Sequence, residues 1–187
     1  MSSRNKHKIA QYKNGSGLSL SAVRTFGRQL FRALRHIHSV GIVHADLKPD
    51  NIVLNRKLNV AKICDFGSAY RADELSSLSS TQYIVARYYR APEIVLNYAA
   101  KSAAMDIWSI GVTLVEMYTS KLLFTGRHNN ALLKSIMDLL GPVPKALIRR
   151  SEHRSKYFRH DFKFLLLEKN RGSGTESTRP INPTRQM

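Results

Sequence analysis

The segment HADLKPDN, residues 44–51, places acidic, basic and amide side chains between two apolar runs. A carboxylate can accept the proton of an attacking hydroxyl group, a lysine can lie beside a phosphate, and an asparagine can offer an oxygen to Mg²⁺. Asp46, Lys48 and Asn51 supply these three groups in that order. This set of side chains is therefore suited to phosphoryl transfer.

Two further short motifs follow along the chain. The sequence DFG at residues 65–67 offers Asp65 as a second Mg²⁺ ligand, and APE follows at residues 91–93. Each motif alone is common by chance, but all three in this order form the signature of protein kinases. The alternative is that these polar residues only cap turns.

On these motifs the chain resembles the C-terminal lobe of a eukaryotic protein kinase, from about Lys8 to its end. The segment YIVARYYRAPEI is similar to the CMGC group, and ICDFGSA, LFTGRHNNALLKSIMDLLGPVPKALIRR and INPT are similar to the pre-mRNA-processing factor four (splicing) kinase family. The resemblance implies a protein-kinase-like α+β fold. Of that fold, this chain would form the mainly α-helical C-terminal lobe, with short β-strands around the catalytic loop and DFG.

The resemblance also implies ATP and Mg²⁺ as cofactors. Asp46 would be the catalytic base and Lys48 the contact to the transferred phosphate. Asn51 and Asp65 would hold Mg²⁺, and Val53 would lie under the adenine ring. The residues implied to contact the cofactors are therefore Lys48, Asp50, Asn51, Val53 and Asp65.

Four further residues take structural roles by the same resemblance. His44 and Phe66 would be the C-lobe members of the hydrophobic spine that joins the two lobes. Asp106 would anchor the backbone of the catalytic loop, and a buried carboxylate needs such donors. Glu93 normally pairs with an arginine in a helix that we expect beyond Met187.

The activation segment, expected at residues 65–93, departs from the usual pattern. Ala45 stands where most kinases carry an arginine that clamps a phosphate, although alanine is usual in the splicing-kinase family. The resemblance implies that Arg87 and Arg90 instead bind phosphotyrosine at Tyr83; the alternative is a tyrosine packed by its neighbours. Ala86 replaces the Ser or Thr that usually bridges the catalytic aspartate and lysine.

Apolar periodicity predicts three helices, over residues 20–37, 102–120 and 129–140. Gly41 and Gly141 lie where the first and third helices could end. The second segment is apolar on all sides, which predicts a buried core helix. A shorter helix is expected around residues 8–12.

Short β-branched runs predict strands on both sides of the catalytic loop and before DFG, at residues 42–44, 51–54 and 60–67. The last segment, EKNRGSGTESTRPINPTRQM, is rich in Gly, Pro and polar residues. It is expected to be a surface loop or an unfinished end.

Composition narrows the class of protein. The 187 residues carry 30 Lys plus Arg against 13 Asp plus Glu, a formal charge of +17, which favours acidic or phosphate-bearing partners. A single cysteine, Cys64, excludes an intrachain disulfide framework and a Cys-rich zinc site. No signal sequence or membrane-spanning run is apparent. We therefore expect an intracellular protein that does not enter a membrane.

The domain expectation is one partial kinase domain over residues 1–187, with a CMGC-type insert region at residues 142–187. The sequence contains no glycine-rich loop, no strand lysine and no helix αC glutamate, so we expect the N-terminal lobe and the final helices to be absent and the isolated chain to be inactive.

By resemblance, the expected function is that of a serine/threonine kinase that transfers the ATP γ-phosphoryl group to protein hydroxyls in pre-mRNA splicing. It would be a nuclear, otherwise cytoplasmic, monomeric phosphoprotein. Its partners would be protein substrates, with Ser/Arg-rich splicing factors as candidates. One alternative is a catalytically inactive interaction module. Another is nucleic-acid binding through the positive charge, but no recognised binding motif supports it.

Overall fold

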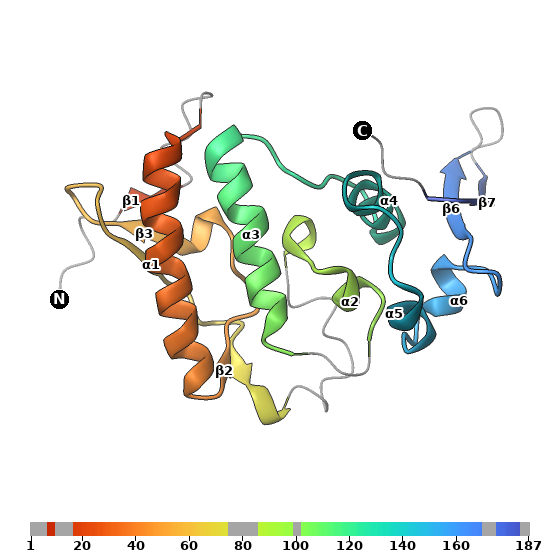
Figure 1. Ribbon diagram of the computed structural model, residues 1–187, viewed down its shortest axis with the longest axis horizontal. Coiled ribbons are helices and arrows are strands. Elements are labelled where there is room, and N and C mark those ends of the chain that lie inside the picture. The colour runs from red at the N-terminus through yellow and green to blue at the C-terminus, as the bar shows by residue number, and fades with distance from the viewer. Residues whose placement is uncertain (1–6, 10–16, 75–85, 99–101, 170–174, 184–187) are drawn as a thin grey trace. The chain divides into compact units, whose positions relative to one another are not determined.

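In the computed structural model the chain forms two compact units (Figure 1). The first unit comprises residues 1–90 and 102–123, and the second comprises residues 91–101 and 124–187. The residues that the structure describes are 7–9, 17–74, 86–98, 102–169 and 175–183.

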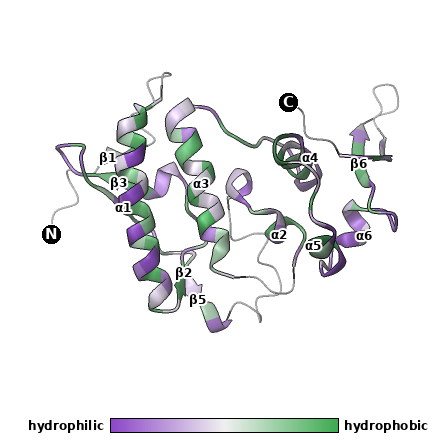
Figure 2. Ribbon diagram, viewed as in Figure 1, coloured by the Kyte–Doolittle hydropathy of each residue, from purple (hydrophilic) through white to green (hydrophobic). Residues whose placement is uncertain are grey.

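Two long helices form the first unit, α1 (Leu20–Ser39) and α3 (Ala104–Thr119), and they pack side by side (Figure 1). Ser19 caps α1, since its hydroxyl oxygen accepts a hydrogen bond from the Ala22 N–H at 3.3 Å. Hydrophobic and hydrophilic residues alternate around α1 (Figure 2). The hydrophobic residues of its inner face are buried, whereas Leu20 at its start is exposed: the buried ones are Val23, Phe26, Leu30 and Leu34. Both predicted helices are confirmed, and Gly41 follows the first with a φ of +73°.

The expectation that α3 is buried on every side is wrong. Ile107 is 44% exposed and Tyr118 is 50% exposed, whereas Ile110 and Met117 are buried. The helix therefore has one face in the core of the first unit and another with exposed apolar side chains. Its sequence gives little sign of this difference because apolar residues occupy both faces.

Short strands flank the loop that carries HADLKPDN. β2 (Ile42–Val43) pairs with β5 (Tyr70–Arg71), and the 3₁₀ helix η2 (Pro49–Asn51) follows β2. β3 (Ile52–Leu54) lies between β1 (His7–Lys8) and β4 (Ala61–Ile63) in an antiparallel sheet. Two further 3₁₀ helices follow, η3 (Ala72–Glu74) and η5 (Arg87–Tyr89). The strands predicted around the loop and before DFG are thus confirmed.

The short helix expected around residues 8–12 is wrong at its first residue. Lys8 belongs to β1, which pairs with β3 in the register His7 to Leu54 and Lys8 to Val53. This pairing spans more than 40 residues of sequence, so local periodicity could not reveal it. Residues 10–16 lie outside the described residues.

The core of the first unit joins α1 and α3 to the loop and to the sheet. Leu30 and Leu34 come from α1, Leu47 from the loop, Ile52 from β3 and Ile110 from α3, and all five are fully buried. The loop is therefore packed into the core of the first unit through Leu47, and the sheet through Ile52.

The second unit contains one long helix, α4 (Asn129–Leu140), with Gly141 as its C-cap, which confirms the third predicted helix. Its other helices are short: α2 (Pro92–Val95), α5 (Lys145–Arg149) and α6 (Arg154–Tyr157). The core of this unit consists of apolar side chains from these helices and from Phe164, which follows α6; among the helical ones are Ile94, Leu132, Leu133, Met137 and Ile148.

The surface loop expected at residues 168–187 is wrong where this segment forms strands, at residues 168–169 and 176–181. β6 (Phe164–Lys169) and β7 (Glu176–Ile181) form an antiparallel hairpin, in register from Phe164 opposite Ile181 to Lys169 opposite Glu176. Nearly every side chain of β7 is exposed, so the sequence lacks the alternation that marks a half-buried strand.

Asn130 of α4 attaches this hairpin to the second unit. Its Nδ2 donates a hydrogen bond to the carbonyl of Leu165 at 2.6 Å, and its Oδ1 accepts one from the N–H of Leu167 at 2.9 Å. Asn130 is itself buried. One side chain therefore satisfies two backbone groups on the free edge of β6.

Among the described helices, none is long and apolar enough to cross a bilayer.

Candidate active site

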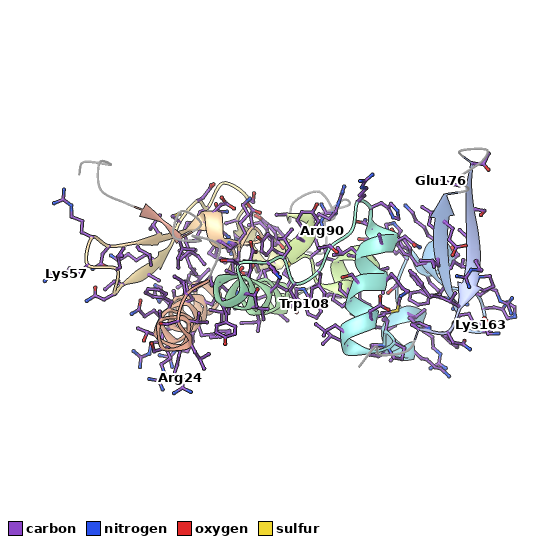
Figure 3. The ribbon with its side chains drawn as sticks, turned by 90° about the horizontal axis from the view of Figure 1, so that it is seen from above. Arg24, Lys57, Arg90, Trp108, Lys163 and Glu176 are labelled. Carbon is purple, nitrogen blue, oxygen red and sulfur yellow. The ribbon has the colours of Figure 1, made fainter. Side chains whose placement is uncertain are left out.

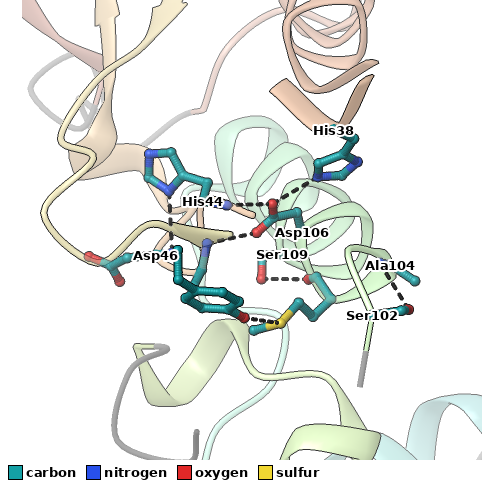
Figure 4. Close-up of polar contacts among 10 residues, drawn as sticks. His38, His44, Asp46, Ser102, Ala104, Asp106 and Ser109 are labelled. Carbon is teal, nitrogen blue, oxygen red and sulfur yellow. Dashed lines mark hydrogen bonds and ion pairs between the residues drawn. The ribbon is translucent and has the colours of Figure 1, made fainter. Parts of the chain in front are cut away.

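The catalytic loop is held in place by Asp106, a buried carboxylate of α3 (Figure 4). Its Oδ2 accepts a hydrogen bond from the N–H of His44, and its Oδ1 accepts one from the N–H of Ala45, both at 2.9 Å. Ala45 has a φ of +64°, a left-handed conformation that is unfavourable for alanine. The two charge-assisted bonds stabilise this turn of the backbone and, in return, satisfy the buried carboxylate.

A third group on the same carboxylate was missed by sequence reasoning. The Nε2 of His38, near the end of α1, lies 2.9 Å from Asp106 Oδ2 (Figure 4). The carboxylate accepts, so the ring nitrogen donates. His38 and Asp106 are 68 residues apart, and nothing in the local pattern of α1 distinguished His38 from its polar neighbours.

The loop brings Asp46, Lys48 and Asn51 together. Lys48 Nζ lies 2.7 Å from Asp46 Oδ2, and Asn51 Nδ2 donates to the same oxygen at 2.9 Å and to the Asp46 carbonyl at 2.7 Å. Asp46 Oδ1 accepts no hydrogen bond from any described residue. One oxygen of this carboxylate is thus fixed by two donors, and the other accepts no hydrogen bond from the described residues.

Asp65 lies next to Asn51 through the backbone. The N–H of Cys64 donates to the carbonyl of Asn51 at 2.9 Å, beside the paired strands β3 and β4. Asp65 is exposed and has a φ of +64°, and its Oδ1 accepts a hydrogen bond from the N–H of Gly67 at 3.3 Å. Because Asn51 donates through Nδ2, its Oδ1 remains without a hydrogen bond from the described residues.

These oxygen donors suit Mg²⁺. Mg²⁺ is usually held by one or two carboxylates together with phosphate oxygens and waters, rather than by a complete cage of protein ligands. The described part of the chain contains no cluster of three or more His, Cys, Asp or Glu side chains that could hold a metal ion.

His44 and Phe66 form the contact between the catalytic loop and DFG. Their rings are edge-on with centroids 4.9 Å apart. His44 is fully buried; its Nδ1 accepts the N–H of Asp46 at 3.3 Å, and its Nε2 donates to the carbonyl of Cys64 at 3.1 Å. His44 therefore contacts the ring of Phe66 and also forms backbone hydrogen bonds in the core.

Comparison with known proteins agrees with this geometry. Residues 1–170 match the protein kinase domain family. The chain belongs to the protein kinase family. It is 37% identical to the serine/threonine-protein kinase prp4 of Schizosaccharomyces pombe over 182 residues, which is 96% of this chain and 37% of the relative. It is 43% identical to prpf4B, a serine/threonine-protein kinase of Dictyostelium discoideum, over 160 residues, which is 86% of this chain and 19% of the relative.

A third relative is a glycogen synthase kinase-3 homologue, YGK3 of Saccharomyces cerevisiae, 40% identical over 141 residues, which is 75% of this chain and 37% of the relative. The chain thus spans little more than a third, or less, of the curated relatives it matches. With kinases of the CMGC group as its relatives, it has the kinase-like fold that the motifs predicted.

Two residues that the resemblance assigns to ATP lie at the edge of the hydrogen-bonded cluster. Val53 is partly exposed in β3, between the buried side chains of Ile52 and Leu54, so it lies on the other face of the strand. Asp50 is exposed in η2 and makes no hydrogen bond with the described residues. Asp50 is therefore not part of the hydrogen-bonded group that Asp46 forms with Lys48 and Asn51.

The end of the activation segment is carried by η5. Arg87 begins this 3₁₀ helix and Arg90 is its C-cap, and side chains three residues apart in a 3₁₀ helix emerge on one side. Ala86 is the N-cap of η5 and offers no side-chain hydrogen bond. Tyr83 lies outside the described residues.

Sequence reasoning also missed how η5 is tied to α3. The hydroxyl of Tyr89 donates to Glu116 Oε2 at 2.5 Å, and the Tyr89 carbonyl accepts from the hydroxyl of Ser109 at 2.8 Å. Burial, followed by the bond to Glu116, raises the pKa of Tyr89 far above its usual value. Tyr89 therefore stays protonated and acts as a donor that fixes η5 on the core helix of the first unit.

Glu93, in α2 of the second unit, has a half-buried carboxyl group. Burial raises its pKa above the usual value. Among the described residues, no lysine, arginine or histidine forms an ion pair with it. In this respect Glu93 differs from Asp106, which is buried among donors.

Proposed function

We propose that this chain carries the catalytic C-terminal lobe of a serine/threonine protein kinase, which transfers the γ-phosphoryl group of ATP to protein hydroxyls. The observation that supports this most directly is the hydrogen bonding of the Asp46 carboxylate. One of its oxygens is held by Lys48 and Asn51, while the other accepts no bond from the described residues. Membership of the protein kinase family supports the same reaction.

Each residue of the cluster has a role in this proposal. Asp46 orients the substrate hydroxyl and accepts its proton at Oδ1. Lys48, 2.7 Å from Asp46 Oδ2, places a positive charge beside the carboxylate and the transferred phosphate. Asn51, through Oδ1, and Asp65, through its carboxylate, would hold Mg²⁺. Bound Mg²⁺ would neutralise charge on the β- and γ-phosphates of ATP.

We further propose that residues 65–93 act as the activation segment. Phosphorylation of Tyr83 would place a dianionic phosphate near Arg87 and Arg90, whose emergence from one side of η5 supports joint binding of a single phosphate. Such a clamp would take over the role of the arginine that most kinases carry at the position of Ala45. Residues 142–187, which contain α5, α6 and the β6–β7 hairpin, would form the CMGC-type insert.

The proposed setting is pre-mRNA splicing in the nucleus, with Ser/Arg-rich proteins as substrates and the kinase acting as a monomer. This rests on the motifs shared with the splicing-kinase family and on the identity to prp4 and prpf4B.

We also propose that residues 1–187 alone bind Mg-ATP weakly and transfer no measurable phosphate. In this fold ATP lies between two lobes, and a glycine-rich loop with a strand lysine positions its phosphates. These parts do not occur within the 187 residues. Catalysis here depends mainly on positioning and electrostatics, so the loss of these contacts removes most of it.

A non-catalytic interaction module is the second candidate. Ala86 favours it, since no hydroxyl bridges Asp46 and Lys48 from η5. The direct 2.7 Å contact between those two side chains favours catalysis instead.

The test is transfer of radiolabelled γ-phosphate to a basic, Ser-rich substrate. It compares residues 1–187 alone with the same residues joined to the N-terminal lobe of a related kinase. We expect incorporation only from the joined polypeptide, with its loss in the Asp65→Ala variant. Absence of incorporation from a folded, joined polypeptide would reject the catalytic proposal and favour the interaction module. Incorporation by residues 1–187 alone that depends on Asp65 would show that this lobe needs no partner lobe.

A further inference from the structure

A small apolar hollow lies beside α5 in the second unit. Its volume is about 230 Å³, and its lining includes Pro142, Pro144, Ile148, Phe158, Phe162 and Pro183. Pockets for cofactors and other small molecules usually measure about 300–1,000 Å³. This hollow is therefore of a size for a single large side chain.

Two cations lie at the hollow. Lys145, which also lines it, has its Nζ 5.4 Å from the centre of the Phe162 ring, and the guanidinium carbon of Arg149 lies 5.2 Å from the same centre. The attraction of each cation to the ring restricts side chains that would otherwise be mobile. A ligand that pairs with them consequently loses less side-chain entropy on binding.

These cations have no acidic partner within the described residues. Lys145 and Arg149 are four residues apart on α5, so their like charges destabilise the helix slightly. Residues 142–163 contain seven lysines and arginines but only two acidic residues. Asp161 pairs with Arg159 and Lys163, and Glu152 accepts a hydrogen bond from Asn97. The positive charge of α5 is thus available to an external group.

We propose that the hollow and the two cations of α5 form a docking site for an acidic peptide segment of a partner protein. A large apolar side chain of the peptide enters the hollow, and neighbouring Asp or Glu carboxylates pair with Lys145 and Arg149. The apolar cavity is complementary to an apolar side chain of the peptide, and the positive charge at its edge is complementary to acidic residues on both sides of that side chain.

The same geometry disfavours a nucleic acid at this site. Single-stranded nucleic acids bind by stacking their bases on open aromatic rings beside a basic groove. At the hollow, Phe158 is buried and both cations lie over the ring of Phe162, so neither ring is open to a stacking base.

Docking of a peptide would recruit a partner protein, and it does not depend on the proposed transferase activity.

The experiment measures fluorescence anisotropy of a short labelled peptide, with one central leucine flanked by glutamates, titrated with the 187-residue chain. The test variant is Lys145→Glu with Arg149→Glu. The matched control is Arg56→Glu with Lys57→Glu, which makes the same change of charge in the exposed turn between β3 and β4, from which Lys57 extends (Figure 3). Circular dichroism checks that each variant is folded.

We expect the α5 variant to weaken peptide binding by roughly tenfold or more and the control to change it by less than about twofold. Replacing the peptide leucine by serine should weaken binding to the unchanged chain by a similar factor, and this comparison needs no variant to fold. Equal losses in the two charge variants would overturn the proposal, since the overall charge would then explain binding. Equal binding of the serine and leucine peptides would also overturn it. A third outcome against the proposal is a single-stranded oligonucleotide that displaces the peptide, binds more tightly than the peptide, and fails to bind the α5 variant.

Discussion

Asp106→Asn offers a direct test of how the catalytic loop is held. The carboxylate accepts three hydrogen bonds, from the N–H groups of His44 and Ala45 and from the ring of His38. An asparagine of the same shape has one accepting oxygen. If this oxygen takes the place of Oδ2, it can still accept from His44 and His38, but the amide NH₂ then faces the N–H of Ala45.

The expected cost follows from these bonds. A buried N–H without a partner costs about 1–3 kcal/mol, and the loss of charge from the two remaining bonds adds about 1 kcal/mol. Asp106→Asn should therefore lower the free energy of unfolding by about 2–4 kcal/mol. For a chain of this length that corresponds to a fall in Tm of about 4–16 °C.

The measurements are urea unfolding followed by circular dichroism, and hydrogen exchange of the backbone amides in residues 42–52. Asp73→Asn is the matched control, because Asp73 is exposed and pairs with the exposed Arg71, and such exposed pairs contribute little to stability. We expect faster exchange at His44 and Ala45 in Asp106→Asn only. Equal unfolding free energies for the two variants, with unchanged exchange at these amides, would refute the reasoning.

Four further outcomes are expected. With an N-terminal lobe joined, Asp46→Asn should lower kcat by about 10²- to 10⁴-fold at saturating ATP and Mg²⁺; a full rate would remove Asp46 from its role. In that polypeptide Tyr83→Phe should lower activity, and mass spectrometry should find Tyr83 phosphorylated in active enzyme. Because burial raises the pKa of Glu93, its ionisation costs stability as pH rises above about 4.3, so Glu93→Gln should raise Tm at pH 7 but not at pH 4. Asn130→Ala should release β6 from α4 and speed hydrogen exchange at the backbone amide of Leu167, without weakening peptide binding at α5.

The sequence predicted what local patterns can encode. Helical spacing located α1 and α4, and the β-branched runs located β2 and β3 on either side of the catalytic loop. The grouping of Asp46 with Lys48 and Asn51 was also predictable, because these residues lie within one loop and the motif fixes their spacing.

What the sequence did not predict depends on contacts between distant segments. β1 pairs with a strand far along the chain, and β7 has almost no buried side chains to give it a pattern. His38 and Tyr89 are each positioned by a carboxylate of α3, from 68 and 27 residues away. Neither residue differs in its local sequence from a surface histidine or a packed tyrosine.

The backbone bond from Cys64 to Asn51 also bears on how this region tolerates change in length. It lies at one end of the β3–β4 ladder, and the turn lies at the other end, where Asn55 Oδ1 accepts from the N–H groups of Asn59 and Val60. The ladder, and not the turn, sets the spacing between Asn51 and Asp65. Residues added at the exposed positions Arg56 and Lys57 would therefore enlarge the turn and leave these two oxygen donors in register. Insertions at this turn are thus compatible with the geometry of the active site. A single residue added within β4 would instead shift Asp65 out of register with Asn51.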